Sequence, residues 1–316
     1  MDLLISDFFM APRIAKLPKL NWTHISPILE EDIGYLEKNY KFHYLDIKDC
    51  REGVQRPKMD IYKHYIFAIF HFPIYNKKKK RVNIKSLNVF VGKDFLITLS
   101  PEKDRFLESL SLRARQKTSK QLSSDITDNG AAFLLYKILD VLYRKYLPLI
   151  NKIGNQISHI EDEVYSGKNK IANLDLAISR RNIINLRRIL EPQLKIMSKL
   201  VHMDNKVISS SLSIYFDDID DYIENMWAAL GNHRESVDGL YDTNESFINQ
   251  RTNEVIKVLT IISVALLPLT LIASIYGMNV VGLPFADHPT GLWIIFFLMG
   301  GMVAGSIYFA KKNNMI

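Results

Sequence analysis

The chain has 316 residues, which is enough for one large or two smaller globular domains with a buried core. A single cysteine, Cys50, excludes a disulfide framework and any metal site built from several cysteines, and it fits a reducing cytosol. The formal net charge is +7, but basic and acidic residues are intermixed, so we expect contact with anionic lipid headgroups and no nucleic-acid partner.

Residues 1–129 predict an N-terminal α/β domain whose strands form one mostly antiparallel sheet. Ser26 as an N-cap, Pro27 at the first helical position and the acids that follow predict a helix over about 27–39. Three later stretches are rich in β-branched and aromatic residues and predict strands. They are KFHYLDIKD at 41–49, MDIYKHYIFAIFHFPIY at 59–75 and VNIKSLNVFVGKDFLITLS at 82–100.

A basic run, Asn76-Lys77-Lys78-Lys79-Lys80-Arg81, lies between the last two of these stretches. Such a run could bind phosphates or lipid headgroups. It is also the ordinary way to keep a hairpin tip in water and a sheet edge from pairing. The pattern favours the solvated tip.

Residues 130–213 predict a cytosolic helical hairpin, because 130–164 and 171–204 each carry apolar residues at three- and four-residue spacing. Ser166-Gly167-Lys168 predicts the turn between them. Pro148 and Pro192 predict kinks or breaks inside the two helices.

A stalk helix begins near Ile214 and, if unbroken, runs to Ile275 and enters the membrane without a linker. The acidic cluster 217–221 would open this helix, where its simplest role is to complement the N-terminal helix dipole. The alternative is a cation sensor.

Two apolar runs near the C-terminus predict a helical hairpin that crosses a membrane. Residues 255–275 and 292–310 are each long enough, at ~1.5 Å per residue, to cross a hydrocarbon core of ~30 Å. The outer loop 280–291 between them is too short for a separate domain. Lys and Arg flank the spans on one side only, including the tail 311–316, so the positive-inside bias places both termini in the cytosol.

One face of the first span is small or hydroxylated, whereas Ile, Leu and Val dominate the rest of its circumference. Its members fall within an arc of roughly 120° at ~100° per residue; they are Asn253, Thr260, Ser263, Leu267, Thr270, Ser274 and Gly277. Periodicity alone leaves two explanations open, a contact between helices and a water-lined path.

The tetrapeptide Tyr276-Gly277-Met278-Asn279 directly after this span resembles the signature of the CorA family of divalent-cation channels. Further similar segments are Gln55-Arg56-Pro57-Lys58, Thr252-Asn253-Glu254-Val255 and Leu267-Pro268-Leu269-Thr270. The resemblance covers most of the chain. It implies an α+β fold in which a cytosolic α/β domain, a long helical hairpin and a stalk helix at 214–279 lead into two C-terminal spans, assembled as a homopentameric funnel.

The resemblance also implies a transport path. Gly277, Met278 and Asn279 would form the selectivity filter, where neutral oxygens hold hydrated Mg²⁺ through its waters. Gly277 would let the backbone leave the helix. The positions that match the pore lining are Asn253, Leu259, Ser263, Leu267 and Thr270, with the two leucines as apolar constrictions.

A regulatory ion site at subunit interfaces is implied as well. Asp218 and Asp242 match two of its carboxylates, whereas a third acidic position is occupied by Lys63-His64. His64 in place of an acid would weaken Mg²⁺ and favour a softer metal or proton sensing. Alternatively, His64 simply points out of a strand into solvent.

The outer loop departs from the family pattern. Many members follow the motif with Met-Pro-Glu-Leu, but here Val280-Val281-Gly282-Leu283-Pro284-Phe285 follows, and only Asp287 and His288 are left to attract cations. The Gly-x-Pro form is similar to the ZntB branch, which is associated with zinc.

The leading hypothesis is therefore an integral membrane protein of the inner or plasma membrane, a homopentameric channel for Mg²⁺, with Co²⁺ or Ni²⁺ as further ions and gating by cytosolic ion. A Zn²⁺ transporter of the ZntB type, proton-coupled or not, and a membrane-anchored scaffold are the alternatives. The sequence contains no G-x-x-x-x-G-K-[ST], H-E-x-x-H or G-x-S-x-G motif, so we expect no enzyme.

Overall fold

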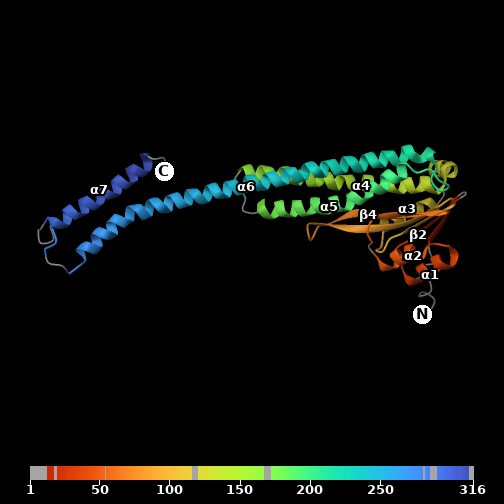
Figure 1. Cartoon of the computed structure of the whole chain (residues 1–316), viewed down its shortest axis with the longest axis horizontal. Helices are drawn as coiled ribbons and strands as arrows, with labels where there is room; N and C mark the ends of the chain where they lie inside the picture. Colours follow the sequence, from red (N-terminus) through yellow and green to blue (C-terminus); the bar gives the residue numbers. More distant parts are fainter. Residues whose placement is uncertain are drawn as a thin grey trace. The chain divides into compact units, whose positions relative to one another are not determined.

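The computed structural model describes residues 13–17, 20–53, 55–115, 120–166, 172–279, 282–284 and 290–312. The chain divides into two units, Met1–Leu240 and Tyr241–Ile316. Figure 1 shows the secondary-structure elements in sequence colours. The predicted turn at 166–168 and the outer-loop residues Asp287 and His288 lie partly or wholly outside the described residues.

The first unit contains a six-stranded sheet in the order β1-β2-β6-β5-β4-β3. Its strands are β1 (Arg13–Leu17), β2 (Leu20–Ile25), β3 (Lys58–Ile61), β4 (Tyr65–Asn76), β5 (Arg81–Gly92) and β6 (Phe95–Leu99). Neighbouring strands are antiparallel except for β2 and β6, which run parallel. The predicted α+β class with a mostly antiparallel sheet is confirmed.

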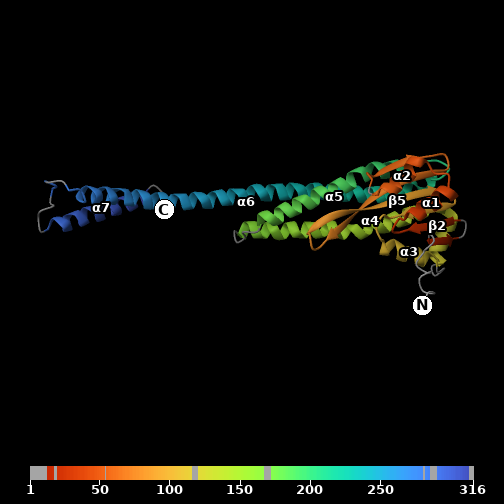
Figure 2. The same ribbon diagram turned by 90° about the horizontal axis from the view of Figure 1, so that it is seen from below.

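Helices cover both faces of this sheet (Figures 1 and 2). The short helices α1 (Glu30–Asn39) and α2 (Tyr44–Glu52) pack on one face, where Phe67, Phe90 and Ile97 are buried. The longer helices α4 (Lys120–Ser166) and α5 (Ala172–Val201) lie on the other. Residues 65–73 of β4 are therefore all buried, which explains why that stretch of sequence is almost continuously apolar.

The first helix begins later than predicted. Leu29, not Ser26, is the N-cap of α1, and its backbone N–H donates to the Asp32 carboxylate at 2.9 Å. The Ser26 hydroxyl is used elsewhere: it donates to the Glu102 carbonyl at 3.1 Å and accepts from the Asp104 N–H at 2.6 Å. Acids in the first turn were thus a better guide to the helix start than the serine and proline before it.

The prediction of a strand at 41–49 is wrong, because most of this stretch forms α2. Asp46, Ile47 and Cys50 are buried at the three- and four-residue spacing of a helix face. The imidazole of His43 caps this helix by accepting the Leu45 N–H at 3.2 Å. The predicted strand at 59–75 is in fact β3 and β4, separated by residues 62–64.

The basic run forms the tip of the β4–β5 hairpin, as predicted, with a turn at residues 77–80. Lys77 to Lys80 are exposed, but the tip also contacts α5. The Lys80 carbonyl accepts from the Asn182 amide at 3.0 Å, and the Lys80 ammonium lies 3.5 Å from Asp175. The tip is therefore both solvated and held by the helical layer.

The remaining described elements are helical: α3 (Arg105–Arg115), the 3₁₀ turn η2 (Ser210–Leu212), α6 (Ser213–Tyr276) and α7 (Gly291–Lys312). Neither α4 nor α5 ends at its proline, Pro148 or Pro192, so the prolines do not break the helices, and the alternative of a kink stays a prediction. The one non-helical residue inside α4 is Gly130, at φ 72°, a conformation that glycine adopts without strain.

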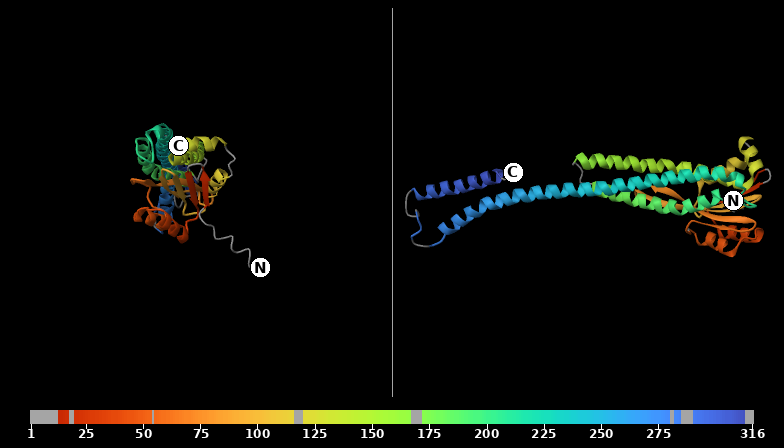
Figure 3. Two further views of the ribbon diagram at one scale, coloured as in Figure 1. Left: turned by 90° about the vertical axis from the view of Figure 1, so that its right-hand side faces the viewer. Right: turned by 45° about the horizontal axis from the view of Figure 1, so that its top comes forward.

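The stalk prediction is confirmed, because α6 is one helix of 64 residues that continues through Pro268 (Figure 3, right). Its first turn contains no acid, so the cluster at 217–221 begins one turn too late to complement the helix dipole as predicted. Both α6 and α7 are long and apolar enough to cross a membrane, and almost none of their apolar windows is buried.

Candidate functional site

Helix α6 ends at the Gly277-Met278-Asn279 segment. The Gly277 N–H donates to the Ala273 carbonyl at 2.9 Å, and the Met278 N–H donates to the Ile275 carbonyl at 3.2 Å. A Cβ atom on Gly277 would lie 3.1 Å from the Ala273 carbonyl oxygen, so glycine allows this tight final turn. Met278 and Asn279 are exposed immediately after the turn.

Tyr276 fixes the start of the outer loop. Its hydroxyl donates to the Pro284 carbonyl at 2.9 Å and so closes the segment that contains Asn279. Asn279 therefore lies just after a regular helix, in a segment whose two ends are joined by the hydrogen bond from Tyr276 to Pro284. A neutral amide in that position offers a carbonyl oxygen to water or to a hydrated cation.

The five predicted pore positions all lie on α6 and are all exposed in the single chain; they are Asn253, Leu259, Ser263, Leu267 and Thr270. Because the helix is unbroken, their spacing places them within an arc of about 120°. The continuous helix therefore preserves the one-sided pattern found in the sequence.

The hydroxyl groups of this arc donate back into their own helix. Ser263 donates to the Leu259 carbonyl at 2.9 Å, and Thr270 donates to the Leu267 carbonyl at 2.8 Å. Thr260 likewise donates to the Ile256 carbonyl at 2.8 Å. With their protons used inside the helix, these hydroxyls keep only acceptor lone pairs for other partners, and such acceptors suit the donor waters around a cation.

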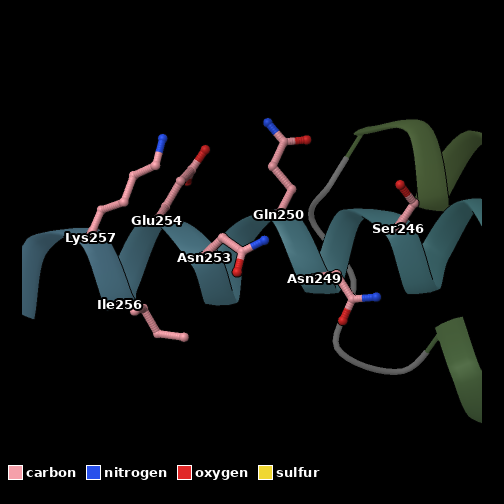
Figure 4. A pocket seen from close by; sticks show the side chains of 7 residues that line it. All are labelled: Ser246, Asn249, Gln250, Asn253, Glu254, Ile256 and Lys257. Carbon is pink, nitrogen blue, oxygen red and sulfur yellow. The ribbon is translucent and has the colours of Figure 1, made fainter. Parts of the chain in front are cut away.

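A polar hollow lies on α6 around Asn253, N-terminal to the other four positions (Figure 4). It is lined by Ser246, Asn249, Gln250, Asn253, Glu254, Ile256 and Lys257. Gln250, Glu254 and Lys257 project from one side of the helix, whereas Asn249 and Ile256 project from the opposite side. Sequence reasoning missed Asn249, although its four-residue spacing from Asn253 would have placed it on the same arc.

The residues proposed as a regulatory ion site do not meet within one chain. Asp218 and Asp242 are both on α6 but about six to seven turns apart, and His64 is exposed between β3 and β4. Among the described residues, no group of three or more His, Cys, Asp or Glu side chains could hold a metal ion.

Asp218 has a partner that sequence reasoning missed. Arg144 on α4 lies 3.3 Å from its carboxylate, and the same guanidinium contacts Asp140 one turn earlier on α4 at 2.5 Å. Hydrogen bonding to Asp140 is the main reason why the pKa of Arg144 is raised further above its ordinary value. No local pattern reveals the contact with Asp218, because the two residues are 74 positions apart.

Asp220 is the partly buried carboxyl of the acidic cluster. Its burial, and then the charges of Glu224 and Asp217, raise its pKa to about 6. Within the described part of the chain, Asp220 Oδ1 is buried without a hydrogen-bond partner.

Comparison with known proteins gives one consistent result. A family model described as CorA-like Mg2+ transporter protein matches residues 18–312. The chain is 27% identical to a putative metal ion transporter, YfjQ, of Bacillus subtilis, with 94% of this chain and 91% of that protein covered. It is 28% identical to the cobalt/magnesium transport protein CorA of Thermotoga maritima, with 92% and 82% covered.

A solved structure, that of the complete CorA magnesium transporter from Methanocaldococcus jannaschii, resembles the fold with a TM-score of 0.77 at 19% identity. The match covers 94% of this chain and 92% of that one. At this identity the likeness establishes the fold and not the ion.

Proposed function

Because the chain belongs to the family of CorA-like Mg²⁺ transporters, which move divalent cations across membranes and are not enzymes, we propose that it is a homopentameric channel for hydrated Mg²⁺. Co²⁺ and Ni²⁺ are further ions of similar coordination chemistry. The observation that carries the proposal is the position of Gly277-Met278-Asn279 at the end of the unbroken helix α6.

Selection follows from the chemistry of Asn279. Mg²⁺ binds six oxygens at ~2.0 to 2.1 Å and loses water reluctantly, so a filter works best by hydrogen bonding to the water shell. One chain supplies one Asn279 amide, and therefore several copies must surround an ion. The pentamer is the assembly that the family resemblance implies, with α6 as the inner helix.

Along the rest of the path, the exposed arc of α6 lines the pore in this proposal. Leu259 and Leu267 form apolar constrictions that close by losing water, and the hydroxyls of Ser263 and Thr270 accept hydrogen bonds from passing waters. The residues between 276 and 291 face outward, with Asp287 and His288 attracting cations, and both termini lie in the cytosol. The bilayer is that of the inner or plasma membrane.

The direct test is Mg²⁺ uptake into liposomes that contain the purified protein and a Mg²⁺-sensitive dye. Asn279→Ala removes the amide oxygen and is expected to lower uptake by about tenfold or more, because the ring loses its contacts to the water shell. Asn151→Ala, an exposed amide of α4, is the matched control and should transport normally.

Two results would contradict the proposal. Normal uptake by Asn279→Ala would remove the filter assignment and favour a membrane-anchored scaffold. A purified protein that is not pentameric in lipid nanodiscs would remove the ring itself.

Zinc transport of the ZntB type is the second candidate, and the outer-loop sequence favours it. Gly282-Leu283-Pro284 stands where many family members have Met-Pro-Glu-Leu, so the loop lacks the usual glutamate. Uptake of Zn²⁺ that rises with an imposed proton gradient, in liposomes that take up little Mg²⁺, would support this candidate over the first.

The assignment of His64 and Asp242 to a cytosolic regulatory ion site stays a prediction.

A further inference from the structure

A cation already lies between two acids of the first unit, and it is the guanidinium of Arg144. Its Nε donates to Asp140 Oδ1 at 2.5 Å on α4, and its Nη2 donates to Asp218 Oδ2 at 3.3 Å on α6. The same group stands over the ring of Tyr222, 4.9 Å from the ring centroid, and its Nη1 lies 3.4 Å from the Tyr222 hydroxyl. One side chain thus joins α4 to α6 through two carboxylates and an aromatic ring.

The side chains present do not fit a divalent ion at Asp218. Two carboxylates from different helices would suit such an ion, but the group between them carries only N–H donors and no lone pair for a metal. Mg²⁺ needs six oxygens at ~2.0 to 2.1 Å, some of which are retained waters. The Arg144 guanidinium, which contacts both Asp140 and Asp218, lies where an ion shared by these two carboxylates would have to bind.

Arg144 has two advantages over a free ion. It is on the same helix as Asp140, one turn away, so its presence beside the acids does not depend on the ion concentration of the cytosol. A guanidinium is also more weakly hydrated than Mg²⁺ and stacks on aromatic rings, as it does here on Tyr222. The side chains of Arg144 and Asp218 are 50% and 53% exposed, so a metal could reach the acids if the arginine were absent.

We propose that Arg144 takes the place of a regulatory divalent cation at Asp218, so that the charge neutralising this acid is part of the chain. For transport, the proposal rests on the proposed function and predicts that cytosolic Mg²⁺ does not close the channel by binding at Asp218. The pairing itself belongs to α4 and α6 and holds whether or not the chain conducts ions.

Metal-directed cleavage tests the pairing without any need for transport. Fe²⁺ with ascorbate and peroxide cuts a polypeptide beside the bound ion, and mass spectrometry of the full-length protein in detergent locates the cuts. Arg144→Gln is expected to gain cuts beside Asp140 and Asp218 that excess Mg²⁺ suppresses. Wild type, Arg144→Lys and Arg188→Gln, which removes an exposed arginine of α5, should lack them.

The double variant Arg144→Gln with Asp218→Asn should lose the new cuts, because one of the two acids is gone. Arg144→Met, which keeps an unbranched apolar stem beside Tyr222, repeats the test if the Gln variant does not fold. Cuts at these positions in wild type as strong as in Arg144→Gln would overturn the proposal. So would their absence in a variant that melts like wild type.

Patch recordings with Mg²⁺ applied to the cytosolic face give the transport readout. Wild-type current is expected to change by no more than about twofold over the millimolar range, whereas Arg144→Gln current should fall by about tenfold. Equal inhibition of both proteins would overturn the proposal. Absence of current in both would contradict the proposed function, while the cleavage result would still decide the role of Arg144.

Discussion

Asp220 is a half-buried carboxyl whose ionisation is unfavourable in the fold. Burial is the largest cause, followed by the charges of Glu224 and Asp217, and together they raise its pKa from 3.8 to about 6, although His202 acts in the opposite sense. A raised pKa means that the folded protein binds the proton more tightly than the unfolded chain does. Ionisation of Asp220 therefore lowers the free energy of unfolding. This loss is absent below pH 3.8 and complete above about pH 6.

We expect Asp220→Asn to stabilise the protein near neutral pH, by roughly 1 kcal/mol after allowance for solvent screening. Thermal unfolding of the full-length protein in detergent should show a higher melting temperature at pH 7, and the gain should shrink as the pH is lowered toward 4. Asp221→Asn, at the exposed neighbouring position, is the control. A gain that does not vary with pH would contradict the explanation.

At the scale of elements, the buried amide of Asn182 joins the β4–β5 hairpin to α5 through two hydrogen bonds. Asn182 is 1% exposed, and its side-chain oxygen accepts the Val82 N–H at 3.0 Å while its nitrogen donates to the Lys80 carbonyl at 3.0 Å. Asn185 adds a longer bond to the Val82 carbonyl at 3.3 Å. One asparagine thus satisfies a donor and an acceptor of the hairpin backbone.

Asn182→Ala should therefore leave the Val82 N–H and the Lys80 carbonyl without this partner, at a cost of about 1 to 3 kcal/mol. The measurement is the shift in melting temperature of the detergent-solubilised protein. Asn185→Ala removes a single, longer bond and is expected to shift it less. Equal shifts for the two variants would show that packing, rather than these hydrogen bonds, fixes the hairpin.

Elements with a long regular period could be predicted from the sequence, and short ones could not. The spans, the stalk helix and the hairpin tip followed from periodicity and charge. The stretch 41–49 did not, because a short apolar pattern fits both a strand and a helix, and the cap from His43 together with burial of Asp46 decided for helix. Gly130, and not Pro148, interrupts α4, because a glycine at positive φ leaves no sign in the apolar spacing.

The same distinction holds for the candidate site. The filter motif and the arc on α6 lie within one continuous element, so local sequence was enough to propose them. Arg144 was missed because its partner is on another helix, and only the packing of α4 against α6 brings the two together. Charge pairs of this kind depend on tertiary structure, which neither motif nor period contains.

At the scale of the whole molecule, the proposed orientation can be tested with introduced cysteines. The native Cys50 is 2% exposed, and burial raises the pKa of its thiol to about 12, so it should not react. Leu283→Cys should react with a membrane-impermeant maleimide applied to intact cells, because the proposed orientation exposes the loop between the two spans on the outer side. Asn314→Cys should react only after the membrane is opened; the reverse pattern would contradict the orientation.

The hydroxyls of Ser263 and Thr270 also bear on how energy could be coupled to transport. Each has committed its hydrogen to a carbonyl of the preceding turn, at 2.9 Å and 2.8 Å. Proton transfer along a chain of hydrogen bonds needs groups that accept one hydrogen bond while donating another, and in this arrangement each hydroxyl donates to its own helix and not to a neighbour along the path. If a proton gradient drives transport, the protons must therefore pass through water molecules or ionisable side chains, because the hydroxyls of Ser263 and Thr270 do not form a continuous proton path.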